Sequence, residues 1–174
     1  TAVASGPAAA LRWSSALTEF ARADQERPPP EGGVLFVGSS SIRMWPRMAQ
    51  DFTDVPVVIQ RGFGGSTMAD CHELARELVI RYRPRQVVVY AGENDLMQGR
   101  SPLDVLNSFR AFAQVLRAEL PEVRIAYISI KPSPYNGALL GKVRETNRLL
   151  AAYVATLPQA SFVDVFTPML DATG

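Results

Sequence analysis

Histidine and cysteine are nearly absent from this chain, which has one of each, His72 and Cys71. A single cysteine cannot close a disulfide within the chain, and it offers no set of thiolate ligands for a metal ion. Because Cys71 stands beside apolar positions of an expected helix, we expect it to pack in the core and not to react. The sequence therefore predicts neither a disulfide framework nor a metal site.

An excess of charge of one sign is also missing. Eighteen Lys and Arg stand against seventeen Asp and Glu, which leaves a formal charge of +1, and no long block of like charge occurs. This balance argues against a nucleic-acid surface, and no apolar run approaches the roughly 20 residues of a membrane span. We therefore expect a small-molecule substrate, no nucleic-acid partner and no membrane span; the cellular compartment stays open.

The length of 174 residues and the 47% hydrophobic content fit one globular domain over residues 1–174. Short apolar runs predict buried strands at 34–37, 55–59, 86–91, 124–130 and 161–165. Apolar spacing of three and four residues predicts helices at 8–23, 42–51, 68–83, 102–120 and 139–157. Within the domain, residues 1–30 are expected to form an N-terminal helix and a proline turn.

Strands that alternate with helices imply parallel pairing through right-handed crossovers. We therefore predict a three-layer, flavodoxin-like α/β/α sandwich with a five-stranded parallel sheet in the order 2-1-3-4-5. In such sheets the ligand site lies beyond the carboxyl ends of the strands, near the point where the strand order reverses. The residues that follow each strand are therefore the ones to inspect for chemistry.

Polar and glycine-rich blocks follow the first three strands: Gly38-Ser39-Ser40-Ser41, then Arg61 to Thr67, then Gly92-Glu93-Asn94-Asp95. Each block alone has a structural explanation. Serines after a strand are usually helix caps, and Asn-Asp pairs are common in turns. The glycine loop lacks the full Gly-x-Gly-x-x-Gly spacing of nucleotide-binding proteins.

Taken in order, the three blocks closely resemble those of the SGNH, or GDSL-type, serine hydrolases, and the resemblance runs from Val34 to about Gly174. That family holds its nucleophile in a Gly-Asp-Ser corner. The resemblance implies that Ser40 is the nucleophile and that Ser39 stands where many members have aspartate.

The same resemblance implies the remaining site residues. The backbone N–H of Gly65, with Gly64 as the alternative, and the side-chain amide of Asn94 would complete an oxyanion hole. Ser39, Gly64 and Asp95 would be accompanying binding residues. Neutral donors of this kind stabilise the charge that develops on the carbonyl oxygen, by about 3 to 4 kcal/mol each.

The implied activity is hydrolysis of small acyl esters through an acyl-serine intermediate, without a metal or organic cofactor. Because the sequence resembles the platelet-activating-factor acetylhydrolase-like and lysophospholipase-like subgroups, acetyl or other short-chain esters are favoured. Acetylated sugars and thioesters stay open. Lys131 to Tyr135 are expected to form a loop beside the site, whereas Arg43 and Trp45 are expected to pack the first helix.

The family's general base has no counterpart in the sequence. Members end with an Asp-x-x-His block, but neither Asp164 nor Asp171 is followed by such a histidine. His72 lies on an expected helix after the second strand, where a surface or capping role is favoured over that of a base. Without a base, a serine hydroxyl is a weak nucleophile near neutral pH.

Three interpretations of this absence stay open. We expect that the chain lacks the C-terminal part of the domain, including the Asp-x-x-His block. A short protein that binds acylated ligands without turning them over is the second interpretation, and completion of the site by another chain is the third. The first predicts weak or absent activity and self-association through exposed apolar surface. The rival function is a non-catalytic flavodoxin-like domain that binds acylated ligands.

Overall fold

A five-stranded parallel sheet forms the centre of the molecule, with the strand order β2-β1-β3-β4-β5. The computed structural model describes residues 7–173, so residues 1–6 of the expected domain and Gly174 lie outside the description. The strands are β1 (Val34–Gly38), β2 (Val58–Gly62), β3 (Gln86–Tyr90), β4 (Arg124–Ile128) and β5 (Ala160–Val163). Each neighbouring pair is parallel, which confirms the predicted α/β fold and its strand order.

The second strand lies about three residues later than its apolar run suggests, at Val58–Gly62 and not at residues 55–59. Pro56 has no N–H to give to a ladder, and the chain reaches β1 only where the N–H of Val34 donates to the oxygen of Val57 (2.9 Å). The polar residues that this shift brings into β2 have partners. The Gln60 amide donates to the oxygens of Ile42 (2.6 Å) and Trp45 (3.1 Å).

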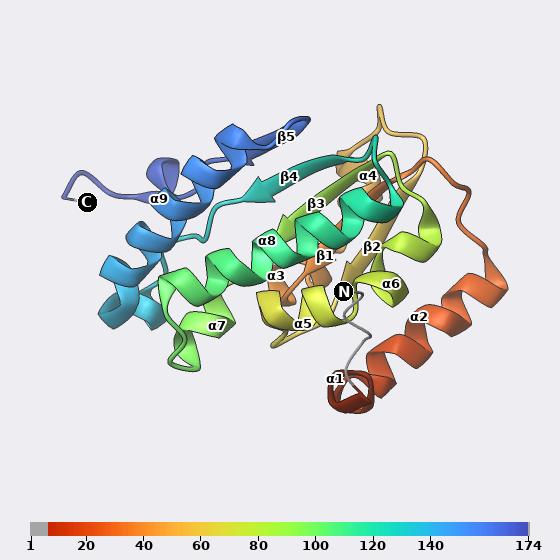
Figure 1. Cartoon of the computed structure of the whole chain (residues 1–174), viewed down its shortest axis with the longest axis horizontal. Helices are drawn as coiled ribbons and strands as arrows, with labels where there is room; N and C mark the ends of the chain where they lie inside the picture. Colours follow the sequence, from red (N-terminus) through yellow and green to blue (C-terminus); the bar gives the residue numbers. More distant parts are fainter. Residues whose placement is uncertain (1–6, 174) are drawn as a thin grey trace.

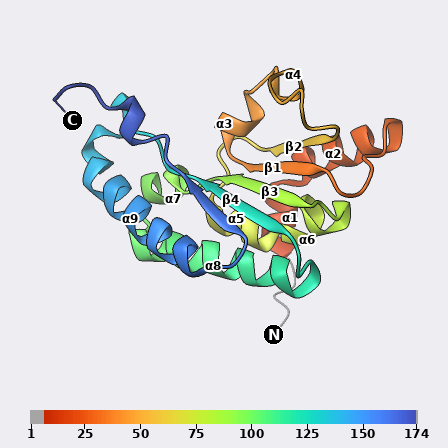
Figure 2. The ribbon, with the colours of Figure 1, turned by 90° about the horizontal axis from the view of Figure 1, so that it is seen from above.

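Most helices cover one face of the sheet, as Figures 1 and 2 show. They are α1 (Pro7–Arg12), α5 (Met68–Glu73), α6 (Ala75–Leu78), α8 (Pro102–Glu119) and α9 (Leu140–Thr156), while α2 (Ser14–Glu26) lies beside the edge strand β2. Helix α8 begins with a capping box between Ser101 and Asp104 and has Pro102 at its first position, as the sequence predicts. Phe109, Phe112 and Tyr127 are among the fully buried side chains of the core on this face.

Only short helices pack on the opposite face within residues 7–173. They are α3 (Ser40–Arg43) and α4 (Met48–Asp51), and they cover β1 and β2. The sequence predicts one helix over residues 42–51, but Pro46 separates two. Phe36, Trp45 and Phe52 form a small aromatic cluster beneath them.

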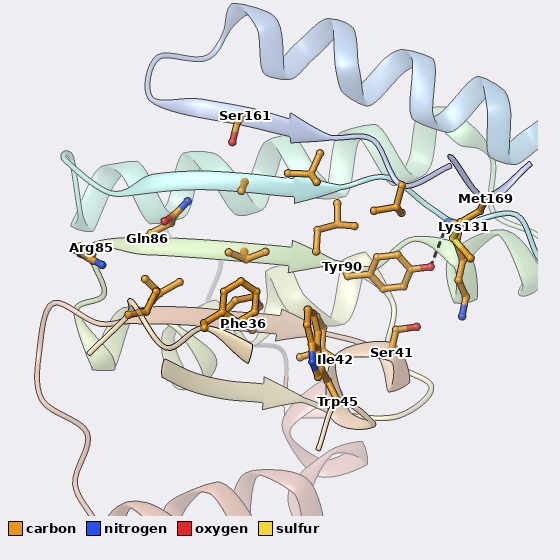
Figure 3. A pocket seen from close by; sticks show the side chains of 18 residues that line it. Phe36, Ser41, Ile42, Trp45, Arg85, Gln86, Tyr90, Lys131, Ser161 and Met169 are labelled. Atoms are coloured by element: carbon orange, nitrogen blue, oxygen red, sulfur yellow. Dashed lines mark hydrogen bonds between the residues drawn. The ribbon is translucent and has the colours of Figure 1, made fainter. Parts of the chain in front are cut away.

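The remaining part of that face is an apolar groove with a volume of about 640 Å³. Side chains that alternate along the strands line it, among them Val88, Ile128 and Val163. In Figure 3 Ser41, Tyr90 and Lys131 lie at one end of the groove, and Arg85 and Gln86 lie at the other. The third layer of the sandwich is therefore partial over the described residues.

Short elements follow the carboxyl ends of three strands: α7 (Glu93–Met97) after β3, η2 (Pro134–Leu139) after β4 and η3 (Thr167–Met169) after β5, whereas η1 (Ile80–Tyr82) lies between α6 and β3. No helix in the described part of the chain combines the length and the apolar character that crossing a membrane requires.

Candidate active site

The serine block makes a sharp corner between β1 and α3. Gly38 ends the strand with a φ of 147°, and a Cβ at this position would lie 1.9 Å from the oxygen of Tyr90, so only glycine fits there. The N–H of Ser39 then donates to the same oxygen (3.1 Å), and the Ser39 side chain is buried. Ser40 follows as the first residue of α3 and is exposed. Of these serines, Ser40 is therefore the one that solvent reaches most freely.

The third serine lies beside a neighbouring tyrosine. Ser41 is half-buried and lies with Tyr90 at one end of the groove, as Figure 3 shows. Burial, and then the nearby Glu93 carboxylate, raise the pKa of Tyr90, so its hydroxyl stays protonated near neutral pH. The Glu93 carboxylate and the backbone N–H of Lys131 both lie 3.4 Å from this hydroxyl. Tyr90 is a residue of the site region that sequence reasoning missed, although it is the last residue of a strand.

The glycine block lies directly against the serine corner. The N–H of Phe63 donates to the oxygen of Gly38 (2.9 Å). A Cβ on Gly62 would lie 2.3 Å from the backbone nitrogen of Arg43. The strand β2 and the helix α3 can therefore approach closely only because residue 62 is glycine. A Cβ on Gly64 would lie 3.9 Å from the Cβ of Ser40. The second block is therefore beside the first, as the predicted fold requires.

The two candidate oxyanion glycines face different neighbours. Gly64 faces Ser40, whereas Gly65, which has a φ of 81°, faces the Trp13 ring, 3.8 Å from the position of a Cβ. Neither backbone N–H donates a hydrogen bond to any group within residues 7–173, and the N–H of Ser40 is free as well. These N–H groups remain available to an oxyanion, and Gly64 is the glycine whose Cα faces the serine.

Trp13 forms a wall beside this loop. It lies between α1 and α2, and its ring meets Phe63 edge-on, with centroids 5.0 Å apart. The neighbouring Arg12 forms an ion pair with buried Asp70, which forms the capping box of α5 with Thr67. The apolar spacing that predicts a helix over residues 8–23 gives no sign that Trp13 reaches the glycine loop.

The third block is tied to the second. The Asn94 amide donates to the oxygen of Ser66 (2.9 Å), and Asp95 accepts from the N–H of Met68 (2.7 Å), at the start of α5. An amide nitrogen carries two hydrogens, so Asn94 keeps one donor after bonding to Ser66. Asp95 is fully buried, and burial raises the pKa of its carboxyl group. Asp95 therefore holds loops together beneath the site.

Neither the histidine nor the late aspartates contact Ser40. His72 is half-buried on α5 and makes no hydrogen bond to Ser40 in the described chain; burial lowers the pKa of its imidazole. Asp164 accepts from the N–H groups of Phe166 (2.9 Å) and Thr167 (3.1 Å), and Asp171 accepts from Thr173. Both aspartates thus serve local turns.

The residues next to the nucleophile corner divide between packing and exposure. Trp45 packs as expected, against Phe36 and Phe52, and its ring N–H donates to Asp51 (2.7 Å). Arg43 does not pack in the core: it is exposed, and its guanidinium lies on Gly64. Lys131 lies near Tyr90 and Ser41, as Figure 3 shows, while the side chain of Tyr135 lies outside the described residues.

Within the described chain, no group of three His, Cys, Asp or Glu could hold a metal ion.

Comparisons with known proteins show the family and the fold. The model of the GDSL-like lipase/acylhydrolase family matches residues 30–174. A GDSL-like lipase from Bacteroides thetaiotaomicron VPI-5482 superposes with a TM-score of 0.75 and 23% identity, over 90% of this chain and 80% of that one. No curated protein matches the chain in sequence.

Two other solved structures have the same fold. A candidate acylhydrolase from Bacteroides fragilis NCTC 9343 gives a TM-score of 0.77 at 24% identity, over 90% of this chain and 80% of its own. A candidate platelet activating factor from Streptococcus pneumonia gives 0.78 at 21% identity, over 92% and 78%. At these identities the structural likeness establishes the fold.

Proposed function

Because the chain belongs to the GDSL-like lipase/acylhydrolase family, we propose that it is an esterase that cleaves small acyl esters, acetyl or short-chain, through an acyl-Ser40 intermediate. The Ser40 oxygen attacks the ester carbonyl carbon, the carbon–oxygen bond to the alcohol breaks, and the alcohol leaves with a proton. Water then attacks the acyl-serine, which releases the carboxylic acid and restores the serine hydroxyl.

One observation carries this proposal: exposed Ser40 lies next to Gly64 at a place where several neutral donors are free. The backbone N–H groups of Ser40 and Gly64 have no other partner in the described chain, and the Asn94 amide keeps one hydrogen. Preorganised donors of this kind contribute about 3 to 4 kcal/mol each to stabilising an oxyanion. We propose Gly64, or Gly65 beside it, together with Asn94 as the oxyanion donors.

We further propose that residues 1–174 hydrolyse esters only weakly. The sequence holds no Asp-x-x-His block, and its single histidine forms no hydrogen bond with Ser40 in the described chain. Hydrolases that lose the members of their catalytic triad still accelerate the reaction about 10³- to 10⁴-fold over water. This residual rate enhancement comes from the oxyanion hole and from substrate binding. We expect this chain to retain only that remainder.

The test uses p-nitrophenyl acetate with the wild type and with Ser40→Ala, each with and without added imidazole. Imidazole can take the proton that a histidine would take, so it should raise the Ser40-dependent rate. The reaction without protein and the Ser40→Ala protein control for direct catalysis by imidazole, and Ser39→Ala controls for the neighbouring hydroxyl. Equal rates for the wild type and Ser40→Ala at every imidazole concentration would contradict the esterase function. They would favour the alternative, a non-catalytic domain that binds acylated ligands.

A further inference from the structure

Arg43 occupies a defined position beside the proposed nucleophile. It is the last residue of the single turn of α3, three residues after Ser40, and side chains three apart lie on the same helix face. Both side chains face one glycine: a Cβ on Gly64 would lie 3.5 Å from Nη1 of Arg43 and 3.9 Å from the Cβ of Ser40. The close approach of Gly62 to the Arg43 backbone fixes this turn in place. The guanidinium therefore borders the place where an ester carbonyl would meet Ser40.

The Arg43 guanidinium has no partner in the described chain. Five other arginines form ion pairs there, with Asp70, Glu26, Asp24, Glu119 and Glu145. Arg43 is exposed, and no carboxylate of residues 7–173 lies within ion-pair distance of it. Of the other charged residues near the serines, Glu93 contacts the Tyr90 hydroxyl through its carboxylate, and Lys131 contacts it through its backbone N–H. The N–H donors of Arg43 are thus free at the site.

We propose that Arg43 makes this site select acyl esters that carry an anionic oxyacid group, a carboxylate or a phosphate, a few atoms from the ester bond. The proposal rests on Ser40 being the nucleophile. A guanidinium forms two parallel hydrogen bonds with either anion, which gives both attraction and a fixed orientation. Backbone and amide donors would hold the carbonyl oxygen, and Arg43 would hold the anion beside it.

The first test compares three acetyl esters of one phenol: phenyl acetate, 3-carboxyphenyl acetate and the 3-phosphate analogue. Arg43→Gln should lower kcat/KM about tenfold for an anionic ester, the value of one charge-assisted hydrogen-bonded pair, and leave phenyl acetate unchanged. Arg43→Lys keeps the charge and should recover part of the loss. Arg110→Gln removes the same charge from an exposed residue of α8, across the sheet, and should change no ester.

The outcomes separate the two anions and the null result. A loss confined to the phosphate ester assigns the site to phosphorylated substrates, and a loss confined to the carboxylate ester assigns it to carboxylated ones. Equal losses for neutral and anionic esters, or no loss for any of them, would overturn the proposal. Thermal melting of each variant identifies a loss that comes from unfolding.

A second test does not depend on turnover. Acetanilide and 3-acetamidobenzoate are amide analogues of the neutral and carboxylate esters, and NMR titration of the Ser40 to Arg43 amides measures their binding. We expect the anion to bind more tightly than acetanilide to the wild type, and Arg43→Gln to remove the difference. Equal affinities in the wild type, or a difference that survives in Arg43→Gln, would contradict the role of Arg43. The absence of Ser40-dependent hydrolysis would count against the proposed function alone.

Discussion

The corner at Gly38 shows how much of the site depends on single atoms. The strand must turn within one residue so that Ser39 can bond to Tyr90 and Ser40 can start a helix. Glycine allows this because its φ of 147° and its lack of a Cβ bring its backbone against the oxygen of Tyr90. The placement of the proposed nucleophile thus follows from a missing side chain.

Gly38→Ala should therefore be among the most destabilising small substitutions in the chain. The added methyl group would lie 1.9 Å from a backbone oxygen that belongs to the central strand and cannot move freely. Overpacking and the unfavourable φ together should reduce the free energy of unfolding by about 3 kcal/mol or more. Urea unfolding measures this change.

Gly141→Ala is the matched control. Gly141 is an exposed residue of α9 with open space around it, so the same methyl group should be neutral or add up to about 1 kcal/mol through helix propensity. An unfolding free energy of Gly38→Ala equal to that of the wild type would show that the corner can relax, and would contradict the geometry of the site.

At the same scale, the sequence motifs singled out Ser40 and Asn94, whereas the choice between Gly64 and Gly65 depends on the turn. The two glycines are adjacent and chemically identical, and only the φ of 81° at Gly65 turns its Cα toward Trp13 and leaves Gly64 facing Ser40. The sequence also could not predict that the guanidinium of Arg43 is free, because sequence alone does not tell whether an arginine has a partner.

Among the elements, α5 and α7 are joined by a buried carboxylate. Asp95 of α7 accepts from the N–H of Met68 at the first position of α5, and it has no exposed surface. Burial raises the pKa of Asp95 although these N–H donors oppose the shift. The folded protein therefore holds the Asp95 proton at a higher pH than the unfolded chain does.

This gives a pH-dependent prediction with a definite sign. A folded pKa above the unfolded value of 3.8 means that the stabilisation from protonated Asp95 is complete below that value and is lost as pH rises through the folded pKa. Asp95→Asn cannot ionise, so its stability relative to the wild type should improve as the pH rises above the unfolded pKa of 3.8. Urea unfolding of both proteins across this range measures the difference. If the stability of Asp95→Asn relative to the wild type instead falls as the pH rises, the folded protein stabilises Asp95 as the anion.

Element types and order were readable from the sequence, and boundaries less so. The capped start of α8 at Ser101-Pro102 was predictable because its residues act locally. The position of β2 was not, since Gln60 and Arg61 look too polar for a strand and are accommodated only by tertiary partners, the Ile42 oxygen and Asp24 among them. Local patterns cannot reveal such partners.

For the whole molecule, the open groove is the feature with the widest consequences. Residues of four strands present an apolar surface, with Val163 42% and Met169 55% exposed. Surfaces of this kind lower solubility and favour association. The expectation that the chain self-associates therefore stays a prediction, now with a specific face.

Sedimentation velocity over a range of concentrations tests it. The wild type should show a growing fraction of dimers, and Ile128→Lys, which places a charge in the middle of the groove, should reduce that fraction. Leu103→Lys changes an exposed residue of α8 away from the groove and serves as the control. A wild type that stays monomeric at all concentrations, with the same free energy of unfolding as Ile128→Lys, would contradict the prediction.

The central claim is that Ser40 is the nucleophile, and mass spectrometry of the protein after reaction with diethyl p-nitrophenyl phosphate tests it most directly. With imidazole added to accept the hydroxyl proton, the Ser40 oxygen attacks phosphorus, the oxyanion donors stabilise the charge that develops, and p-nitrophenolate leaves, so Ser40 carries a diethyl phosphate group afterwards. We predict one such group, on Ser40, with Ser39 and Ser41 unmodified and no adduct on Ser40→Ala. Modification of a different serine, or equal slow labelling of several, would contradict the claim.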